Sequence, residues 1–365
     1  MTVRGIKAEQ NAIERSKNRA HSLVIAVIGA LVIAALFVSF AIGRYPIKPP
    51  ELLAAVWAKL AGLLNRALIP IFKQQINIPE VSATTNAILW NVRFPRIVLS
   101  CLVGCCLSSA GAAYQGVFQN PMASPDILGA SAGAAMGAAL AILLQLGSRM
   151  VMLFAFGASL ITITLVMLIS RVARGSQVLR IILAGIMVSS LCNAVTSFIK
   201  LVADPNNILP EITYWMMGSL AKTRIASVKL AIIPMLVGLI PLLLIRWRIN
   251  LLTLSDDEAR TMGVSVGKVR FLVIVCATLV TAASVSISGL IGWVGLVVPH
   301  LMRRLVGSNY RHLMPASMVG GALFLLIVDN FSRNLLPTEI PIGILTAIIG
   351  APFFIWMITR EREEI

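Results

Sequence analysis

Long apolar runs separated by short polar connections repeat along this chain from residue 22 almost to its end. Runs of about 18 to 25 apolar residues can cross the hydrocarbon core of a membrane as helices. The pattern therefore predicts an all-α polytopic membrane protein with ten transmembrane helices. Because ten is even, both termini are expected on one side of the membrane. The predicted segments are 22–42, 97–118, 127–146, 151–170, 178–202, 228–245, 269–288, 289–306, 314–331 and 340–359.

The same pattern predicts the domain organisation. A polar tail at 1–21 precedes one transmembrane domain at 22–360, and a second polar tail follows at 361–365. Of the 365 residues, 58% are hydrophobic and only 13% are charged, whereas a soluble protein would carry about 25% charged residues. The composition therefore excludes a soluble globular protein.

Basic residues outnumber acidic ones and give a net charge of +16. They gather at the ends of the apolar runs and do not form a patch with interleaved aromatic residues. The excess therefore indicates orientation in a membrane and not nucleic acid binding. The predicted inner tails and loops hold 18 of the 31 Lys and Arg residues. Both termini are expected in the cytoplasm.

Residue types that could make a metal or catalytic site are sparse. The five cysteines lie in apolar runs, where packing is the simpler interpretation, although Cys101 and Cys105 share a helix face that a soft metal could use. The three histidines are expected to lie far apart at inner helix ends, and a metal site would need them clustered. They are His21, His300 and His312. The sequence predicts no metal site.

Nucleotide and ion chemistry are also poorly represented. The run 263–269 resembles a phosphate loop only loosely, because the glycine spacing is one residue short and no Ser or Thr follows Lys268. Ionisable residues deep in the apolar runs are scarce, with Lys200, Asp204 and Asp329 the main candidates. Ion-driven carriers usually place such groups near the middle of the membrane. A secondary transporter is therefore the weaker alternative.

Residues 43–96 form an unusually long outer connection. Pro49 and Pro50 begin an expected helix at 51–64, since proline is favoured in the first turn. Residues 73–85 are expected to be irregular. Three roles remain open for this connection: covering the outer mouth, contacting a partner, or a tolerated insertion.

The inner connection 250–268 is polar and has helix-capping residues. Ser255 is the expected N-cap of a short helix that ends at Gly263. Acidic residues in its first turn match the helix dipole; they are Asp256, Asp257 and Glu258. A structured cytoplasmic contact surface is one interpretation, and a helix lying on lipid is the other.

Two glycine-containing hairpins interrupt the apolar runs. In the hairpin 92–137, the Asn120-Pro121-Met122 turn ends one helix, and three glycines spaced four apart permit close helix packing in the next. These glycines are Gly129, Gly133 and Gly137. Glycines before Pro299 predict a second break, at 288–304. Paired breaks in the two halves of a chain are typical of a transport pathway.

The order of these motifs resembles the FecCD/BtuC-like permease subunits of bacterial ABC importers for iron chelates, haem and cobalamin. The similarity covers about residues 22–360. It rests on RFPR (93–96), GAAYQGVFQNPMASPDILGASAGA (111–134), LAGIMVSSLCNAVTSF (183–198), YWMMGSL (214–220), LSDDEARTMGV (254–264), GLIGWVGLVVPHLMRRLVG (289–307) and EIPIGILTAIIGAPFFIW (339–356). The departure from the family pattern is an insertion near 64–85.

The resemblance implies a type II importer: a homodimer of ten-helix subunits, two ATPase subunits inside and a substrate-binding protein outside. The coupling contact with the ATPase would use Ser255, Asp256, Asp257, Glu258, Arg260, Met262 and Gly263. The docking of the binding protein would use exposed arginines at Arg93, Arg96 and Arg333, which can steer an acidic partner. The inner gate and pathway would use Asn120, Pro121, Met122 and Gly185.

The expected function is transport of an iron(III)-siderophore-type chelate into the cytoplasm across the bacterial inner membrane. Haem, cobalamin or an oxyanion are the alternative cargoes, and a heterodimer with a paralogous permease is the alternative assembly. This chain is expected to be no enzyme and to bind no cofactor, with ATP and magnesium on the partner subunits. A membrane-embedded enzyme would need the clustered polar site that the sequence lacks.

Overall fold

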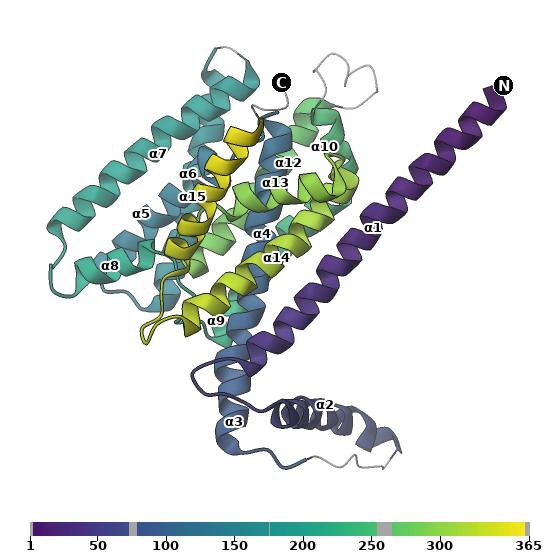
Figure 1. Ribbon diagram of the computed structural model, residues 1–365. Helices are drawn as coiled ribbons and strands as arrows, with labels where there is room; N and C mark the ends of the chain where they lie inside the picture. The colour runs from purple at the N-terminus through teal and green to yellow at the C-terminus, as the bar shows by residue number, and fades with distance from the viewer. Residues whose placement is uncertain (1–2, 73–78, 175, 254–264, 362–365) are drawn as a thin grey trace.

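The computed structural model describes residues 3–72, 79–174, 176–253 and 265–361, and this part of the chain is helical, without strands (Figure 1). Ten of the helices overlap the ten predicted apolar segments. The elements are α1 (Val3–Ala41), α2 (Pro49–Phe72), α3 (Ala83–Ala87), the π-helix η1 (Ile88–Arg93), α4 (Phe94–Val117), the 3-10 helix η2 (Pro125–Leu128), α5 (Ala130–Leu143), α6 (Ser148–Val172), α7 (Gln177–Val202), α8 (Ile208–Met216), α9 (Ile225–Leu244), α10 (Arg246–Leu252), α12 (Val266–Ser288), α13 (Val294–Val306), α14 (Tyr310–Asn334) and α15 (Ile342–Glu361).

Seven helices of the described chain are long and apolar enough to cross a membrane. They include α1, α4 with its α3–η1 extension, α6, α7, α9, α12 and α14. Helices α5 and α15 are apolar but shorter, and the 13 residues of α13 span only about 20 Å. The chain is therefore a multi-pass membrane protein, and ten complete crossings stay a prediction.

Helix α4 is the centre of the bundle. It contacts α9, α12, α13 and α14, and 78% of the most apolar window in the continuous helix 83–117 is buried. Glycines permit this close packing: Gly104 faces the backbone of Gly321 in α14, and Gly111 faces the backbone of Gly295 in α13. Small residues at such contacts let helices approach closely in a membrane.

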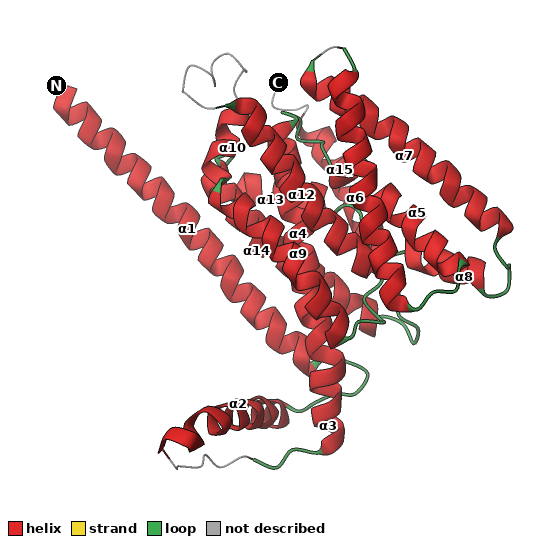
Figure 2. Ribbon diagram, turned by 180° about the vertical axis from the view of Figure 1, so that it is seen from behind, coloured by secondary structure: helices red, strands yellow, loops and turns green. Residues whose placement is uncertain are grey.

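A second group of helices packs on one side of this centre. Helix α5 lies between α6 and α7, and it also contacts α8 and α12. Its residues are alanine, glycine, serine, leucine, isoleucine and methionine, so its whole surface can pack against neighbouring helices. Both views show α7 at the edge of the bundle, with α8 crossing below it (Figures 1 and 2).

The helical structure is interrupted between α12 and α13. Helix α12 ends at Ser288, Gly289 has φ +69°, Trp293 has φ +68°, and α13 begins at Val294. The predicted interruption of the second hairpin is present, but Pro299 does not make it, because that residue lies inside α13. The left-handed glycine ends α12, since a side chain is strained in that conformation.

The outer connection contains a longer helix than predicted. Helix α2 was expected at 51–64 but extends from Pro49 to Phe72. The apolar residues 67–72 continue its pattern. Of the irregular stretch expected at 73–85, residues 73–78 lie outside the described chain, and the expectation is wrong for 83–85, because Ser82 caps the short helix α3 there. After these, the short α3 leads directly into η1 and α4. Both views show α2 and α3 beyond one end of the bundle (Figures 1 and 2).

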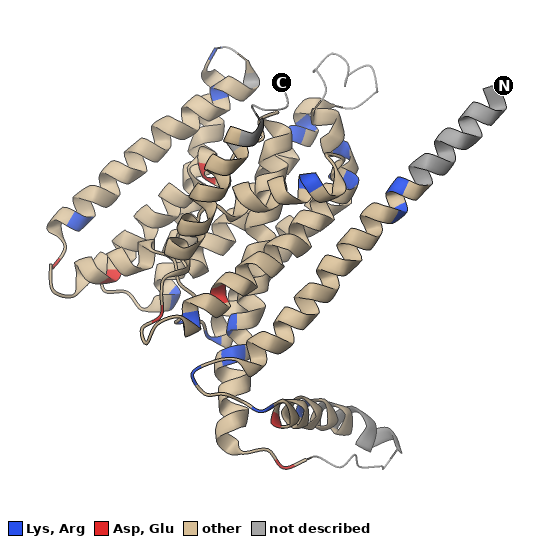
Figure 3. Ribbon diagram, in the orientation of Figure 1, with Lys and Arg blue, Asp and Glu red and all other residues tan. Residues whose placement is uncertain are grey.

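The two ends of the bundle differ in the elements that they carry. The start of α1, the end of α15 and α10 lie at one end, and α2 lies at the other (Figures 1 and 2). Most charged residues of the described chain lie towards the two ends, and the middle of the bundle is largely uncharged (Figure 3). The start of α1 and the end of α15 lie at the same end of the bundle, as the even number of predicted segments led us to expect.

Candidate functional site

The turn after α4 has a defined local structure. Gln119 has φ +51°, and the side-chain oxygen of Asn120 accepts a hydrogen bond of 2.9 Å from the backbone N–H of Met122. An Asn side chain that bonds the backbone two residues on stabilises a tight turn. The predicted gate residues Asn120, Pro121 and Met122 are all exposed, so they are available to contact another chain or a cargo.

This turn is bonded to α10. The Nε2 atom of Gln119 donates to the carbonyl oxygen of Leu252 at 2.9 Å. Nearby, a Cβ atom at Gly116 would lie 2.6 Å from Ile249, so the end of α4 touches α10 at close range. Leu252 is the last residue of α10 and lies two positions before the segment 254–264.

The other side of α10 is bonded to the start of α14. Asn250 donates through Nδ2 to the side-chain oxygen of Asn309 at 3.0 Å, and its own Oδ1 accepts from the N–H of Tyr310 at 2.8 Å. Helix α10 is thus held by α4 and by α14. The predicted coupling residues at 255–263 (Ser255, Asp256, Asp257, Glu258, Arg260, Met262 and Gly263) lie outside the described residues.

The glycines predicted to permit helix packing lie at close contacts. Gly133 and Gly137 are in α5, where a Cβ atom would lie 2.2 Å from Thr162 and 2.3 Å from the carbonyl oxygen of Phe154, both in α6. Gly129 lies before α5 with φ +79° and caps η2. The three glycines therefore do not all belong to one helix, because the first adopts a left-handed turn.

Gly185 is also at a close contact. A Cβ atom there would lie 2.3 Å from the carbonyl oxygen of Ile127 in η2, so this glycine brings α7 against η2 and does not face open space. The exposed side chains beside it are Ile186 and Met187. At this part of α7 these two side chains are accessible, and Gly185 itself is at a helix contact.

Arg93 holds the end of α1. Its guanidinium donates to the carbonyl oxygens of Phe40 and Tyr45 and, at 3.3 Å, to that of Ala41. The last carbonyl groups of a helix lack partners within the helix, and a basic side chain can satisfy them. Only 4% of Arg93 is exposed.

Arg96 and Arg333 belong to a buried ionic cluster with Asp329 and Glu339. The Nε atom of Arg96 lies 2.9 Å from Asp329 Oδ1, and its Nη1 lies 2.8 Å from Glu339 Oε2. The Nε atom of Arg333 lies 3.2 Å from Asp329 Oδ2, and its Nη2 donates to Ser39 of α1 at 2.7 Å. The cluster joins α1, α4 and α14.

The expectation that the three arginines are exposed is wrong. Exposed fractions of 4%, 5% and 7% for Arg93, Arg96 and Arg333 show that they are buried. The physical reason is that carbonyl and carboxylate groups of the same chain surround them, and a buried charge needs such partners. Docking of a binding protein at these residues stays a prediction.

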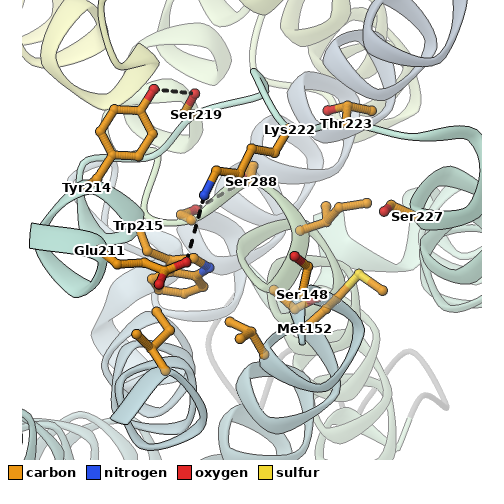
Figure 4. A pocket seen from close by; sticks show the side chains of 15 residues that line it. Ser148, Met152, Glu211, Tyr214, Trp215, Ser219, Lys222, Thr223, Ser227 and Ser288 are labelled. Atoms are coloured by element: carbon orange, nitrogen blue, oxygen red, sulfur yellow. Dashed lines mark hydrogen bonds and ion pairs between the residues drawn. The ribbon is translucent and has the colours of Figure 1, made fainter. Parts of the chain in front are cut away.

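A pocket of about 120 Å³ opens between α6, α8 and α12 (Figure 4). Hydroxyl groups dominate its polar lining. Ser286 and Ser288 donate to carbonyl oxygens of their own helix, and Thr223 donates to that of Leu220 in the connection between α8 and α9. The exposed pair Lys222–Glu211 lies at its rim, with 3.7 Å between the charged atoms. The residues labelled in Figure 4 are Ser148, Met152, Glu211, Tyr214, Trp215, Ser219, Lys222, Thr223, Ser227 and Ser288.

Three chain segments join by backbone hydrogen bonds next to this pocket. Ser219 N–H donates to the carbonyl oxygen of Ser288 at 2.7 Å, and Ile342 N–H donates to that of Gly218 at 2.8 Å. Gly218 (φ +70°) and Gly289 have no room for a side chain here. This junction connects the end of α8 with the end of α12 and the start of α15.

The expectation that the three histidines lie far apart is wrong for two of them, and the expected lack of a metal site stays a prediction. The rings of His21 and His312 lie 5.3 Å apart, edge to face, because α1 packs along α14. His312 also contacts the side-chain oxygen of Asn18 at 3.0 Å. Among the described residues, no group of three or more His, Cys, Asp or Glu side chains could hold a metal ion.

The sequence reasoning missed the acidic partners of the arginines and the bonding of α10. Asp329 and Arg333 are four residues apart in one helix, a spacing at which side chains meet, so this ion pair had a local signal. Glu339 and Gln119 had no such signal, because their partners are distant in the sequence.

Comparisons with known proteins agree with the resemblance found in the sequence. The profile of the FecCD transport family matches residues 24–360. The molybdate import system permease protein MolB of Haemophilus influenzae is 38% identical over 328 residues, covering 89% of this chain and 91% of that protein. A probable iron chelatin transport system permease of Helicobacter pylori is 38% identical over 283 residues, covering 78% and 86%.

A solved structure shows the same fold. An inward-facing ABC transporter described as of the metal-chelate type superposes with a TM-score of 0.80 at 33% sequence identity, covering 93% of this chain and 99% of that one.

Proposed function

The chain belongs to the FecCD transport family of ABC importer permeases, and from that membership we propose that its cargo is an iron(III)-siderophore-type chelate. The cargo would pass from an extracytoplasmic substrate-binding protein, through a pathway between two permease subunits, into the cytoplasm. The chain would be a ten-helix subunit in the bacterial inner membrane, with both termini and α10 inside.

The bond between Gln119 and Leu252 is the observation that supports this mechanism best. It joins the turn 120–122, the proposed gate, to the helix that leads into the proposed coupling segment 254–264. An ATPase that moved this segment would therefore also pull on the turn. ATP and magnesium would be bound by the ATPase subunits, and this chain would bind no cofactor.

A homodimer fits the exposed side of α7. Large apolar side chains, including Ile186, Met187 and Leu191, are each more than half exposed along this helix. A second copy could cover them and leave a pathway between the two subunits. Residues 22–360 would form this single domain, with short cytoplasmic tails at 1–21 and 361–365.

Docking of the binding protein at the outer arginines remains part of the proposal, with one condition set by the geometry. Asp329 and Glu339 already neutralise Arg96 and Arg333. An acidic partner would have to compete with these carboxylates, and Glu339 is the accessible one, with 26% of its side chain exposed.

Molybdate is the second candidate cargo, because MolB is 38% identical over most of both chains. The same fold would then carry a small oxyanion in place of a bulky chelate. Haem and cobalamin stay as further alternatives, since cargo choice in such a system would rest largely with the binding protein.

Transport assays test the proposal directly. The chain, reconstituted in proteoliposomes with its cognate ATPase and binding protein, is expected to take up a ferric siderophore only when ATP is hydrolysed. Uptake should persist when ionophores collapse all ion gradients; loss under these conditions would instead identify a secondary transporter. If the system takes up molybdate, haem or cobalamin but no ferric siderophore, the proposed cargo is wrong.

Replacement of Gln119 tests the connection between α10 and the gate turn. Gln119→Leu removes a hydrogen bond worth about 1 kcal/mol, which is about a five-fold change in an equilibrium constant. The variant should still bind and stimulate the ATPase, while uptake per ATP hydrolysed falls about five-fold if this bond transmits the motion.

Gln145 provides the matched control for that experiment. It also has a positive φ, +55°, two residues after the end of a helix, but it follows α5, away from α10. Gln145→Leu should leave uptake per ATP unchanged. Equal ratios for both variants and the wild type would show that Gln119 transmits nothing, whereas loss of ATPase binding would show that Gln119 maintains the ATPase contact and does not transmit its motion to the turn.

A further inference from the structure

One side of α2 carries an apolar stripe that the described chain does not cover. Leu53, Trp57 and Leu60 are 61%, 49% and 48% exposed. At about 100° of rotation per residue, these three positions fall within roughly 60° of the helix circumference. The stripe is therefore continuous along more than one turn.

The opposite side of α2 contacts the rest of the protein. Leu52 and Ala55 are buried in a small cluster with Leu89 of η1 and residues at the end of α1. Lys59 lies over the ring of Trp90, 5.3 Å from its centre. Since these positions hold the helix in place, the stripe must point away from the protein.

The position of α2 brings the stripe close to lipid. Helix α1 is the least buried of the seven spanning helices, with 11% of its most apolar window buried, and exposed residues such as Phe37 and Ile42 continue to its end. Both views show α2 extending from α3 on the side of α1, roughly across the direction of the bundle (Figures 1 and 2). Helix α2 therefore lies where the exposed apolar surface of α1 ends.

We propose that α2 is an interfacial helix that lies on the membrane at the end opposite α10, with its stripe in the boundary between headgroups and acyl chains. A helix that exposes an apolar face can lie in this zone, and the protein holds the opposite face of α2. Tryptophan is enriched there because its ring is apolar and its N–H is polar. Covering the stripe also removes apolar surface from water. The proposal goes beyond the transport function and holds for any cargo.

Lipid fits the stripe better than a protein partner does. The exposed positions 53, 56, 57 and 60 are all apolar, and the stripe offers no charge that would orient a second chain. It also continues the lipid-facing surface of α1. A membrane requires only apolar area and an interfacial anchor, and α2 supplies both.

Fluorescence quenching in vesicles tests the proposal. The full-length chain is reconstituted in phosphatidylcholine brominated either near the headgroup or near the chain ends, and the Trp57→Phe variant is measured alongside. Phenylalanine keeps the stripe apolar, so the fold should persist. The difference between wild type and variant is the emission of Trp57. We expect it to be quenched strongly by bromine near the headgroup, less by deep bromine, and little by iodide in the water.

Two results would overturn the proposal. Strong iodide quenching without bromine quenching would place α2 in water. Protection of Trp57 from both quenchers would show that protein covers it, as a second copy or a binding protein would. Leu60→Trp in the Trp57→Phe background places a second probe one turn along the stripe and should repeat the pattern, so the test does not depend on a single variant.

Discussion

Gly111→Ala is expected to prevent the bundle from forming, or to lower its melting temperature far below that of the wild type. A Cβ atom at residue 111 would lie 1.8 Å from the carbonyl oxygen of Gly295, a backbone atom that no side-chain rotation can move. Overpacking a well-packed core costs about 1–3 kcal/mol, and a clash with backbone should exceed roughly 3 kcal/mol.

Helix α4 cannot avoid this clash by shifting. Gly104 lies two turns earlier on the same face, and a Cβ atom there would lie 2.1 Å from the carbonyl oxygen of Gly321 in α14. Likewise, a Cβ atom at Gly321 would lie 2.2 Å from the carbonyl oxygen of Gly104. Movement of α4 away from α13 would therefore break a second contact of the same kind with α14.

Gly157→Ala is the matched control. Gly157 lies inside α6 and has no atom within 4 Å of an added Cβ. Alanine favours a helix by up to about 1 kcal/mol over glycine, so this variant should melt at or above the wild-type temperature. Thermal unfolding of the purified proteins, with size-exclusion profiles, provides the comparison. If Gly111→Ala has the same melting temperature as Gly157→Ala, the close contact at Gly111 does not limit stability.

The glycines show how far the sequence could predict packing. Spacing of four residues pointed to Gly129, Gly133 and Gly137, and two of these do lie between α5 and α6. The tighter contacts, at Gly104 and Gly111, had the spacing of two helical turns but no local partner. Their partners Gly321 and Gly295 are distant in the chain, and a spacing pattern does not reveal which helices meet.

The positions of the helices were more predictable than their ends. Hydrophobic runs placed ten helices because burial in lipid requires long apolar segments. The same rule does not say that α13 has only 13 residues or that α2 continues to Phe72. The start of α13 depends on the left-handed residues Gly289 and Trp293 that precede it.

The sequence predicted where the arginines lie along the helices but not whether their side chains face outward or are buried. RFPR at the start of α4 marks a helix end, where basic residues are common. Whether the side chains turn outward or inward depends on carboxylates elsewhere, and Glu339 lies 243 positions from Arg96 in the sequence. The inward direction changes the expected consequence of mutation from weaker docking to lower stability.

Asp329→Asn is expected to destabilise the protein by about 3–5 kcal/mol, the range found when one partner of a buried ion pair is removed. The Asp329 side chain has no exposed surface and pairs with both Arg96 and Arg333. Asparagine has nearly the same shape, so the loss would be of charge and not of volume. Arg96 would then keep Glu339 as its carboxylate partner, whereas Arg333 would lose the carboxylate that it pairs with.

The exposed pair Lys222–Glu211 provides the contrast, because its side chains are 78% and 57% exposed. Glu211→Gln should change stability by less than about 1 kcal/mol. The double variant Asp329→Asn with Arg333→Gln should recover part of the lost stability, because it no longer leaves the positive charge of Arg333 buried without Asp329. If Asp329→Asn instead kept its melting temperature but lost transport with limiting binding protein, the cluster would serve docking and not the fold. If the melting temperature falls as expected and the double variant recovers it, the arginines hold α1, α4 and α14 together, because the cluster is where these three helices meet.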